Sequence, residues 1–364
     1  MQHIPGTMKA VLLMGHGGYE QLVFRDDVPV PTPAAGEVLI RIGAAAVNNT
    51  DINTRTAWYS RSVNAGTNAD AAALDATGRA ADSGWTGGGL RFPRIQGADA
   101  CGCIVAVGAG VRADRIGERV LVEPVFRAPG DRDPFAATYF GSECDGAFAQ
   151  YACAPSVHAV TVDSTLTDVE LASFPCSYSA AENMLTRVNL SAGETALVTG
   201  ASGGVGSAAV QLASRRGARV IAISAAAKAS SVEVLGASRV LSRDSDLIAH
   251  LGRESVDAIV DAVGGDAFPA LLELLRRGGR YAAAGAIAGP IVALDLRTLY
   301  LKDLSLLGCT VLRAGVFASL VGYIERGEIR PVVAAVFPLE AITVAQQDFL
   351  AKRHTGKIVL VPPA

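Results

Sequence analysis

The sequence has few charged residues and no excess of either sign. Lysine and arginine number 32 against 35 aspartates and glutamates in 364 residues, giving a net formal charge of −3. Proteins that bind nucleic acids or anionic membranes usually carry a basic surface, so this balance argues against both partners. Hydrophobic residues make up 50% of the chain, which excludes disorder as its overall state. The length fits two domains better than one.

Long apolar runs and an export signal are also lacking. The longest uncharged run, residues 195–214, is interrupted by four glycines, so we expect no membrane-spanning helix. The first ten residues lack the basic and apolar regions of a signal peptide. We therefore expect a cytoplasmic protein.

No C-x-x-C pair occurs among the six cysteines. Without an export signal we expect reduced thiols rather than a disulfide framework. Cys101 and Cys103 form a C-x-C in a predicted strand, which puts both on one face. Two ligands are too few for a zinc site, so we interpret them as buried thiols.

What the chain does contain is a change of pattern along its length. Short strands and turns dominate up to about residue 175, which is typical of an all-β unit. Residues 59–92 interrupt them with Ala, Gly, Asn, Asp and Thr, which predicts a long surface loop, either a lid or a disordered insert. Strands and helices then alternate, which predicts βαβ units and a parallel sheet. We predict an α/β protein in which a domain of residues 176–316 is inserted into one formed by residues 1–175 and 317–364.

The sharpest motif is a glycine-rich turn at residues 199–206, between an apolar strand and a helix. That is the context of a dinucleotide-binding turn. Its glycines permit the tight turn and let backbone N–H groups approach a pyrophosphate, while the helix N-terminus carries partial positive charge. The candidate cofactor residues of this turn are Ala201, Ser202, Gly203, Gly204, Val205 and Gly206. Val263 and Gly285, at the ends of later predicted strands, and Lys357 are further candidates.

Two other motifs overlap this turn. Gly200-x-Ser202-x-Gly204 matches the nucleophile elbow of α/β-hydrolases, and Asp261 and His354 follow in the order of a hydrolase triad. The later strands and the domain order fit a cofactor fold better. The turn also resembles that of short-chain dehydrogenases, but no tyrosine here has the lysine four residues later that this family requires.

Further segments match one known family. They include Val47-Asn48-Asn49-Thr50-Asp51, Gly97-Ala98-Asp99, Gly117-Glu118-Arg119-Val120 and Gly356-Lys357-Ile358-Val359-Leu360. With the glycine turn, they make the sequence resemble the medium-chain dehydrogenase/reductase superfamily over nearly its whole length outside residues 59–92. The resemblance implies a GroES-like β domain with an inserted Rossmann domain, and an active site in the cleft between them.

The zinc ligands of that family are mostly missing. Its zinc-dependent members use a Cys, a His and a later Cys, and the matching positions hold Asn48, Ala98 and Cys176, with Asp99 beside Ala98. A catalytic zinc needs three protein ligands, and a structural zinc needs four, whereas residues 120–148 contain the single cysteine Cys144. We therefore predict no metal. Zinc would polarise a carbonyl for hydride transfer, and a conjugated acceptor needs less such help. The sequence thus resembles the zinc-free quinone oxidoreductase and enoyl reductase branch.

The resemblance also suggests catalytic residues. Thr50 matches the hydroxyl position used for proton relay in alcohol-oxidising relatives, and Tyr59 lies where quinone reductases have cleft tyrosines. Asn49 could donate a hydrogen bond to a carbonyl. Asn49 and Thr50 could equally cap the helix that begins at Asp51.

The end of the second strand of the inserted domain indicates the cofactor. NAD-specific Rossmann folds place an acidic residue there, to bind the ribose 2′-hydroxyl. Here the strand ends at Ser224, and Lys228 and Arg243 follow. A small hydroxyl and two cations suit a 2′-phosphate, which predicts NADPH rather than NADH.

These observations predict an NADPH-dependent oxidoreductase that transfers hydride, without metal, to a quinone or another α,β-unsaturated carbonyl acceptor. One alternative is an alcohol dehydrogenase or carbonyl reductase of the same superfamily, acting either without metal or with metal bound atypically at Cys176 and Asp99. Another is a nucleotide-binding sensor that has lost turnover. The expected partner is a small-molecule substrate. Zinc-free relatives commonly pair the edge strands of their Rossmann sheets, which implies a homodimer through the apolar strand at residues 304–310.

Overall fold

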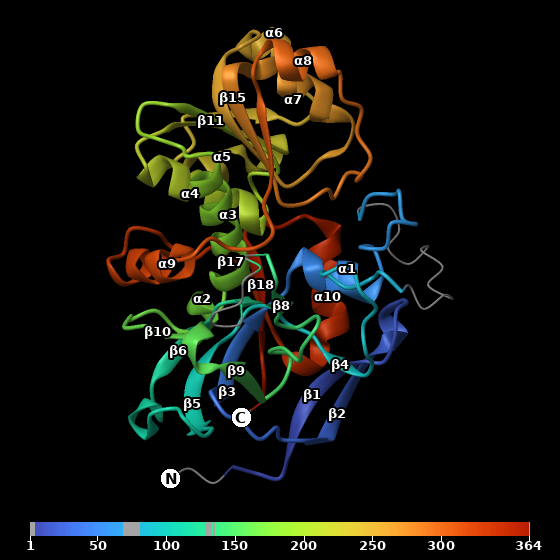
Figure 1. Cartoon of the computed structure of the whole chain (residues 1–364), viewed down its shortest axis with the longest axis vertical. Coiled ribbons are helices and arrows are strands. Elements are labelled where there is room, and N and C mark those ends of the chain that lie inside the picture. Colours follow the sequence, from blue (N-terminus) through green and yellow to red (C-terminus); the bar gives the residue numbers. More distant parts are fainter. Residues whose placement is uncertain (1–3, 68–80, 128–132, 134, 364) are drawn as a thin grey trace.

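The computed structural model describes residues 4–67, 81–127, 133 and 135–363. Figure 1 shows a β-rich unit that carries both chain ends and an α/β unit built around a second sheet. Residues 68–80 of the predicted insertion lie outside the described residues. Among the described residues, every helix is too short or too polar to cross a bilayer.

A seven-stranded sheet forms the centre of the β-rich unit. Its strand order is β10-β6-β5-β3-β18-β17, with β9 also pairing with β3. Val38, Ile40 and Ile42 alternate along β3 and are buried in the same core, as the two-residue period of a strand requires. The strands are β3 (Glu37–Ala46), β5 (Cys101–Val107), β6 (Arg119–Val122), β9 (Tyr151–Pro155), β10 (Ala159–Thr161), β17 (Val333–Pro338) and β18 (Lys357–Val361).

Two smaller sheets complete this unit. One has the order β2-β1-β4 and the other pairs β7 with β8. Their strands are β1 (Thr7–Leu13), β2 (Leu22–Pro29), β4 (Arg94–Ile95), β7 (Val125–Phe126) and β8 (Thr138–Tyr139).

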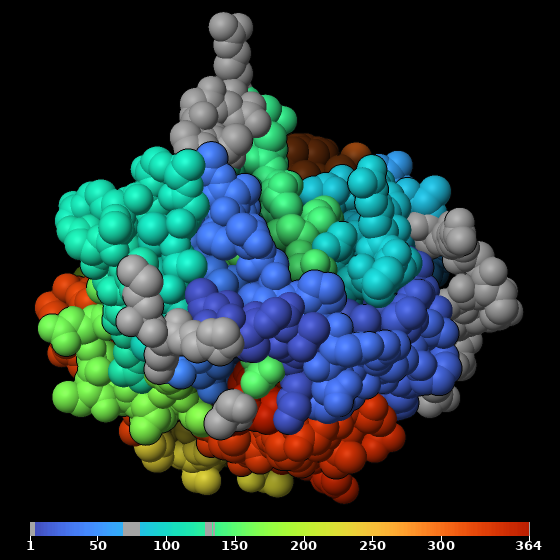
Figure 2. All heavy atoms as spheres, turned by 90° about the horizontal axis from the view of Figure 1, so that it is seen from below, coloured from blue at the N-terminus to red at the C-terminus, as the bar shows by residue number. Residues whose placement is uncertain are grey.

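The β-rich unit is discontinuous in sequence. β18 is antiparallel to β3, with Val359 opposite Ala46. Figure 2 shows the same arrangement on the molecular surface, where C-terminal segments in red lie beside N-terminal segments in blue. The last strand of the chain therefore belongs to the unit that the first strands build.

A six-stranded parallel sheet forms the second unit, in the order β13-β12-β11-β14-β15-β16. This is the strand order of a Rossmann fold. Leu197 and Ile259, in the two central strands, are fully buried, as expected where helices cover both faces. The strands are β11 (Thr195–Val198), β12 (Arg219–Ser224), β13 (Arg239–Ser242), β14 (Val256–Asp261), β15 (Leu275–Ala283) and β16 (Ser305–Gly308). The predicted α/β class with an inserted parallel-sheet domain is confirmed.

The described helices cover this sheet and connect the two units. α3 packs against both α4 and α9. The helices are α1 (Asn49–Arg55), α2 (Asp168–Leu171), α3 (Pro175–Arg187), α4 (Gly204–Arg215), α5 (Ala229–Glu233), α6 (Leu247–Leu251), α7 (Phe268–Leu274), α8 (Leu296–Leu301), α9 (Val316–Glu325) and α10 (Ile342–Ala351). Short 3-10 helices lie at Tyr19–Gln21, Ala113–Arg115, Ser156–His158, Ala226–Lys228, Gly265–Ala267 and Leu339–Ala341.

The predicted loop at residues 59–92 contains neither helix nor strand in its described parts, residues 59–67 and 81–92. Hydrogen bonds nevertheless hold these parts in place. Arg61 N donates to the Asp82 carboxylate at 3.0 Å, and Ser83 Oγ is hydrogen-bonded to His16 Nε2 at 2.7 Å. The C-terminal part of the loop is thus fixed to the β-rich unit.

Candidate active site

The glycine turn links β11 to α4, as predicted. Gly200 has φ +57°, in the left-handed region that favours glycine. A Cβ on Gly206 would lie 2.2 Å from the Gly200 carbonyl oxygen, so the turn folds closely onto itself. Gly203 is the N-cap of α4, and a Cβ there would meet only that same oxygen, at 3.4 Å. The first N–H groups of α4 have no partner within the helix and are suited to bind a phosphate.

Val263 lies beside this turn, and Gly285 lies against the residue before Val263. A Cβ on Gly200 would be 2.9 Å from Val263 Cγ2, and one on Gly285 would be 2.9 Å from the Ala262 carbonyl oxygen. Both residues follow the carboxyl ends of their strands, β14 and β15, where ligands bind in open α/β sheets. The structure therefore places Val263 against the turn and Gly285 next to the strand end that leads to Val263.

The hydrolase triad suggested by the sequence is not assembled. The buried Asp261 carboxylate accepts hydrogen bonds from the Thr199 and Tyr281 hydroxyls and from the Val263 N–H at 2.7 Å. None of the hydrogen bonds of Asp261 among the described residues goes to His354, whose Nδ1 is buried without a partner there. Asp261 instead holds the strand ends that surround the glycine turn.

The candidate residues for a 2′-phosphate lie at the end of β12. Ser224 is buried, and its hydroxyl donates to the Ala225 carbonyl oxygen at 3.3 Å. Lys228 Nζ donates to the carbonyl oxygens of Lys352, at 2.6 Å, and His354, at 2.7 Å. Burial lowers the pKa of Lys228, and the nearby Arg243 lowers it further. Lys228 thus feels the charge of Arg243, while its ammonium is held by the two backbone carbonyls.

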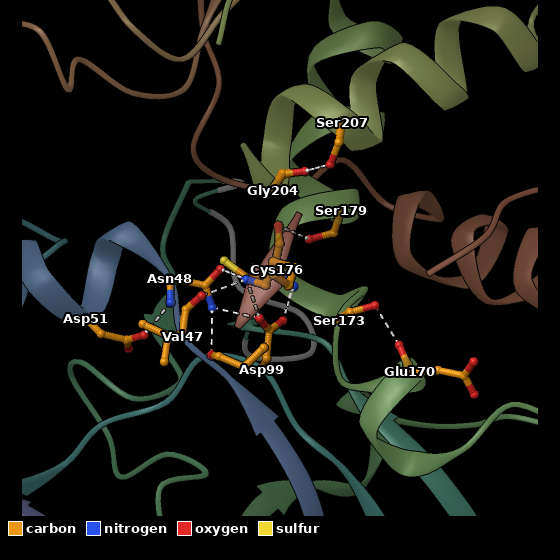
Figure 3. Close-up of polar contacts among 12 residues, drawn as sticks. Val47, Asn48, Asp51, Asp99, Glu170, Ser173, Cys176, Ser179, Gly204 and Ser207 are labelled. Carbon is orange, nitrogen blue, oxygen red and sulfur yellow. Dashed lines mark hydrogen bonds and ion pairs between the residues drawn. The ribbon is translucent and has the colours of Figure 1, made fainter. Parts of the chain in front are cut away.

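A network of buried polar groups, the Asp99 hub, connects the two units (Figure 3). Asp99 Oδ1 accepts the Cys176 N–H at 2.6 Å, and Oδ2 accepts Asn48 Nδ2 at 2.7 Å and the Lys357 ammonium at 2.9 Å. Lys357 Nζ also donates to the Val47 carbonyl oxygen at 3.0 Å and to Asn48 Oδ1. Asp99 and Lys357 are both buried, so each charge depends on the other.

The hub contains the residues that stand at the zinc-ligand positions of the resembled family. Asn48 and Cys176 both bond to Asp99. Burial raises the pKa of the Cys176 thiol, and Asp99 raises it further, so the thiol stays protonated. Within the described part of the chain, no group of three or more His, Cys, Asp or Glu residues is placed to hold a metal ion.

The start of α1 presents the predicted catalytic residues. The helix begins at Asn49 with Asn48 as its N-cap, and the Asp51 carboxylate accepts the Asn48 N–H at 2.7 Å. The alternative in which Asn49 and Thr50 cap this helix is therefore wrong. Burial raises the pKa of Asp51 to about 7.

Thr50 and Tyr59 form a hydroxyl pair. Tyr59 Oη donates to Thr50 Oγ1 at 3.1 Å, which leaves the Thr50 proton available to another acceptor. Burial raises the pKa of Tyr59 to about 12, so its phenol remains a donor. Asn49 Nδ2 donates to Asn53 Oδ1 at 3.2 Å and to Thr67 Oγ1 at 3.4 Å, while its buried Oδ1 has no partner among the described residues. Asn49 thus offers an acceptor rather than the donor expected from the sequence.

Sequence reasoning did not anticipate the buried contact between Lys357 and Asp99 or the places of Trp85 and Tyr139. Lys357, a cofactor candidate in the sequence, has its ammonium group in the Asp99 hub, and its stem lies 2.9 Å from a Cβ placed on Gly204. Trp85 and Tyr139 stack beside Tyr59 and were not identified. No motif in the sequence points to Trp85, and the rarity of tryptophan, with two in the chain, is the one feature that sets it apart.

Comparisons with known proteins agree with this geometry. Residues 34–164 match the family model described as alcohol dehydrogenase GroES-like domain, and residues 204–326 match the one described as zinc-binding dehydrogenase. The first match lies in the β-rich unit, and the second covers most of the parallel-sheet unit. The predicted pairing of a GroES-like and a Rossmann domain is confirmed.

Proteins similar over the full length include two enzymes and one solved structure. The chain is 30% identical to the acryloyl-coenzyme A reductase of Metallosphaera sedula, with 97% of this chain and 99% of that enzyme covered. It is 28% identical to the quinone oxidoreductase of Lama guanicoe, with 97% of each chain covered. A structure from Sinorhizobium meliloti 1021, described provisionally as an alcohol dehydrogenase, has 47% identity and a TM-score of 0.89, with 100% of this chain and 99% of that one covered. The chain belongs to the medium-chain dehydrogenase/reductase superfamily, in its quinone oxidoreductase-like branch, and is an NAD(P)H-dependent oxidoreductase.

Proposed function

We propose that the protein transfers hydride from NADPH to a quinone or another α,β-unsaturated carbonyl acceptor, without a metal ion. The observation that carries this proposal is the Asp99 hub, in which an ammonium group lies among the residues at the zinc-ligand positions. Similarity to an acryloyl-coenzyme A reductase and to a quinone oxidoreductase supports the acceptor class, because both names denote conjugated acceptors.

The donor set of the hub does not fit a zinc ion. Both oxygens of Asp99 already accept hydrogen bonds, which leaves Cys176 as the one sulfur ligand at these positions. The amide of Asn48 and the methyl group of Ala98 replace two stronger ligands. A dication placed here would also be repelled by the Lys357 ammonium, because charges interact more strongly at a buried position than in water.

Without a metal ion as Lewis acid, the hydroxyl pair of Thr50 and Tyr59 is the group that stabilises the acceptor oxygen. The nicotinamide cofactor supplies the hydride, and negative charge develops on the acceptor oxygen. Thr50 can donate its proton to that oxygen, and the hydrogen bond from Tyr59 makes it a stronger donor. Conjugation spreads the incoming charge, so this single neutral donor suits a quinone or enone better than an isolated ketone.

The preference for NADPH is supported by the end of β12. Ser224 is followed by no acidic residue before Lys228, and Arg243 lies within electrostatic reach of Lys228. The exposed side chain of Arg243 makes a long contact to Asp244, at 3.9 Å. Together these groups favour a 2′-phosphate over a free 2′-hydroxyl.

One experiment tests the acceptor class and the metal together. Purified protein is analysed for metals by mass spectrometry and assayed with NADPH and NADH against naphthoquinone, butenone, acryloyl-coenzyme A, acetone and cyclohexanone, with and without a chelator. We expect less than stoichiometric zinc, no effect of the chelator, and turnover of the conjugated acceptors only. Stoichiometric zinc together with chelator-sensitive ketone reduction would overturn the proposal.

Alcohol dehydrogenase activity is the second candidate, favoured by the 47% identity to the Sinorhizobium meliloti protein. It predicts reduction of acetone or cyclohexanone at rates comparable with those of the conjugated acceptors. The same assay therefore separates the two functions.

A further inference from the structure

The beginning of the predicted insertion connects the two units of the molecule. Residues 63–67, named the strap, follow α1 of the β-rich unit, and Gly66 within the strap lies against the segment after β15. A Cβ placed on Gly66 would be 2.5 Å from the Ile287 carbonyl oxygen and 3.1 Å from Ala288 Cα. Two backbones in such close contact require a glycine, because any side chain would overlap the neighbouring carbonyl group.

The strap is attached to the β-rich unit beside the candidate catalytic residues. Trp58, which follows α1, donates its indole N–H to the Ala65 carbonyl oxygen at 2.8 Å. Thr67 is buried, and its Oγ1 accepts a hydrogen bond from Asn49 Nδ2 at 3.4 Å. Asn49 begins α1 and precedes Thr50, so the helix that presents the proposed proton donor also holds the strap.

On its other side, the strap contacts a segment that is tied to the glycine turn. Ala288 N donates to the Val263 carbonyl oxygen at 2.9 Å, and Val263 Cγ2 lies 2.9 Å from a Cβ placed on Gly200. Gly265 N donates to the Gly289 carbonyl oxygen at 3.1 Å. Two backbone hydrogen bonds thus join the loops that follow β14 and β15, and the strap rests on the second of these loops.

The cofactor has to extend between these two attachments. Its pyrophosphate binds at the glycine turn, whereas its nicotinamide has to reach the acceptor at Thr50 for hydride transfer. In open α/β sheets the ligand lies outside the carboxyl ends of the strands, so the cofactor extends from the turn past the loops after β14 and β15 toward α1. The strap joins α1 to the loop after β15 and therefore crosses the route by which a dinucleotide enters and leaves.

We propose that the strap is a gate for the cofactor, which opens at the contact between Gly66 and Ala288 to admit or release the dinucleotide and closes again once it is bound. The hydrogen bonds of the strap to Trp58 and Asn49 lie on the side of the β-rich unit. Among the described residues, no hydrogen bond joins the strap to Ile287 or Ala288, so opening there breaks none. The gate depends on cofactor binding at the glycine turn and not on the class of acceptor.

Stopped-flow mixing with NADPH, followed through the fluorescence of the cofactor itself, tests the gate. In Gly66→Ala the new methyl group overlaps the Ile287 carbonyl, which disfavours the closed position. We expect the association and dissociation rate constants both to rise about fivefold or more, while Kd changes by less than about twofold. A gate that does not touch the cofactor slows entry and release equally, whereas loss of a cofactor-binding contact would raise Kd.

Gly88→Ala is the matched control, because it makes the same change in the same insertion. A Cβ on Gly88 meets no atom within 4 Å, so both rate constants should stay as in the unmodified protein. A second variant, Trp58→Phe, keeps an aromatic ring but removes the hydrogen bond that holds Ala65. Loss of one neutral hydrogen bond should raise both rate constants about 2- to 10-fold.

The possible failures are distinguishable. If Gly66→Ala leaves both rate constants unchanged, or changes only one of them, the strap is not a gate, while the proposed function stands. If Gly66→Ala does not fold, Trp58→Phe decides the question, and unchanged rate constants in that variant would overturn the proposed gate. If the unmodified protein binds NADH in place of NADPH, the same rates are measured with NADH. If it binds neither, the proposed function is wrong and the gate with it.

Discussion

Thr50 contributes the hydroxyl group on which the proposed chemistry depends most. It accepts a hydrogen bond from Tyr59 and is free to donate its own proton. How much that donor matters depends on the acceptor, because a quinone accepts hydride readily whereas a ketone needs its oxygen stabilised.

Thr50→Val should therefore separate the two classes of acceptor. Loss of one preorganised donor slows a reaction that depends on it by roughly 10²- to 10³-fold, and we expect that loss for any ketone or alcohol activity. Quinone reduction should be barely affected. The measurement is kcat/KM with both acceptors, and Thr56→Val is the matched control, because its hydroxyl bonds within the same helix to the Ile52 carbonyl. Equal losses on both acceptors with unchanged thermal stability would favour the alcohol dehydrogenase function.

Asp51 makes stability depend on pH. Burial raises the pKa of its carboxyl to about 7, and its hydrogen bond from Asn48 and the charge of Lys357 only partly offset this. In the unfolded chain the pKa is about 3.9. A group whose pKa is raised by folding binds protons more tightly in the native state, so the stability it contributes is lost as pH rises through 7.

Asp51→Asn should remove that pH dependence. The amide oxygen can still accept the Asn48 N–H, and it carries no charge to bury. We expect the free energy of unfolding of the unmodified protein to fall, relative to the variant, by a few kcal/mol between about pH 4 and about pH 8. Urea titrations at several pH values measure the difference. Parallel pH profiles for the two proteins would contradict the assignment.

Sequence patterns predicted correctly those strands that depend mainly on their own residues. The strands at residues 195–198 and 219–224 occur as expected, because apolar runs bounded by glycine or polar residues need no further information. The sequence pattern also predicts a helix over Phe268–Arg276 that is stopped by Gly278 and Gly279, but α7 ends at Leu274 and β15 begins at Leu275. Pairing with β14 lets β15 run through both glycines.

The candidate site was predictable only in part, because some of its contacts join segments that are far apart in the sequence. The glycine turn is one continuous segment, so its sequence reveals it. In the Asp99 hub, Lys357 comes from the last strand and meets a carboxylate that precedes β5. No local pattern indicates that contact, which exists because β18 returns to the first unit. The stack of Trp85 on Tyr139 likewise joins two segments without a motif.

The end of β12 determines the expected choice of cofactor. Ser224→Asp places a carboxylate where the 2′-phosphate is expected and repels it, whereas a 2′-hydroxyl can donate to it. We expect the ratio of NADPH to NADH affinity to fall at least about tenfold. Ser230→Asp adds the same charge at an exposed position on α5 and should leave the ratio unchanged. Binding of both cofactors by titration calorimetry measures the ratio. An unchanged ratio in Ser224→Asp would contradict the proposed position of the phosphate.

At the scale of the whole molecule, the segment before β18 connects the two units. Its residues Lys352 and His354 accept hydrogen bonds from Lys228, and Gly356 N donates to the Ser202 carbonyl of the glycine turn at 2.9 Å. The next residue, Lys357, reaches the Asp99 hub. Cofactor binding at the turn is thereby linked to the residues around Asn48 and Cys176.

We also propose that the molecule is a homodimer formed at the free edge of the parallel sheet. β16 is the last strand of that sheet, so its outer backbone groups lack a strand partner among the described residues. The segment that leads to β16 exposes large apolar side chains, with Ile291 69%, Leu296 63% and Tyr300 61% exposed. An open edge beside an apolar surface favours association, and pairing β16 with its copy would bury both.

Sedimentation at micromolar concentration should therefore give twice the mass of the chain. Tyr300→Glu places a charge in the contact and should shift the protein toward the monomer, because a charge buried in an interface without a partner costs several kcal/mol. Val344→Glu is the control, since Val344 is 53% exposed on α10 of the other unit and should leave the dimer intact. A monomeric unmodified protein would refute the homodimer. A Tyr300→Glu variant that remains fully dimeric would instead place the interface elsewhere, and the exposed face of α8 would then need another explanation.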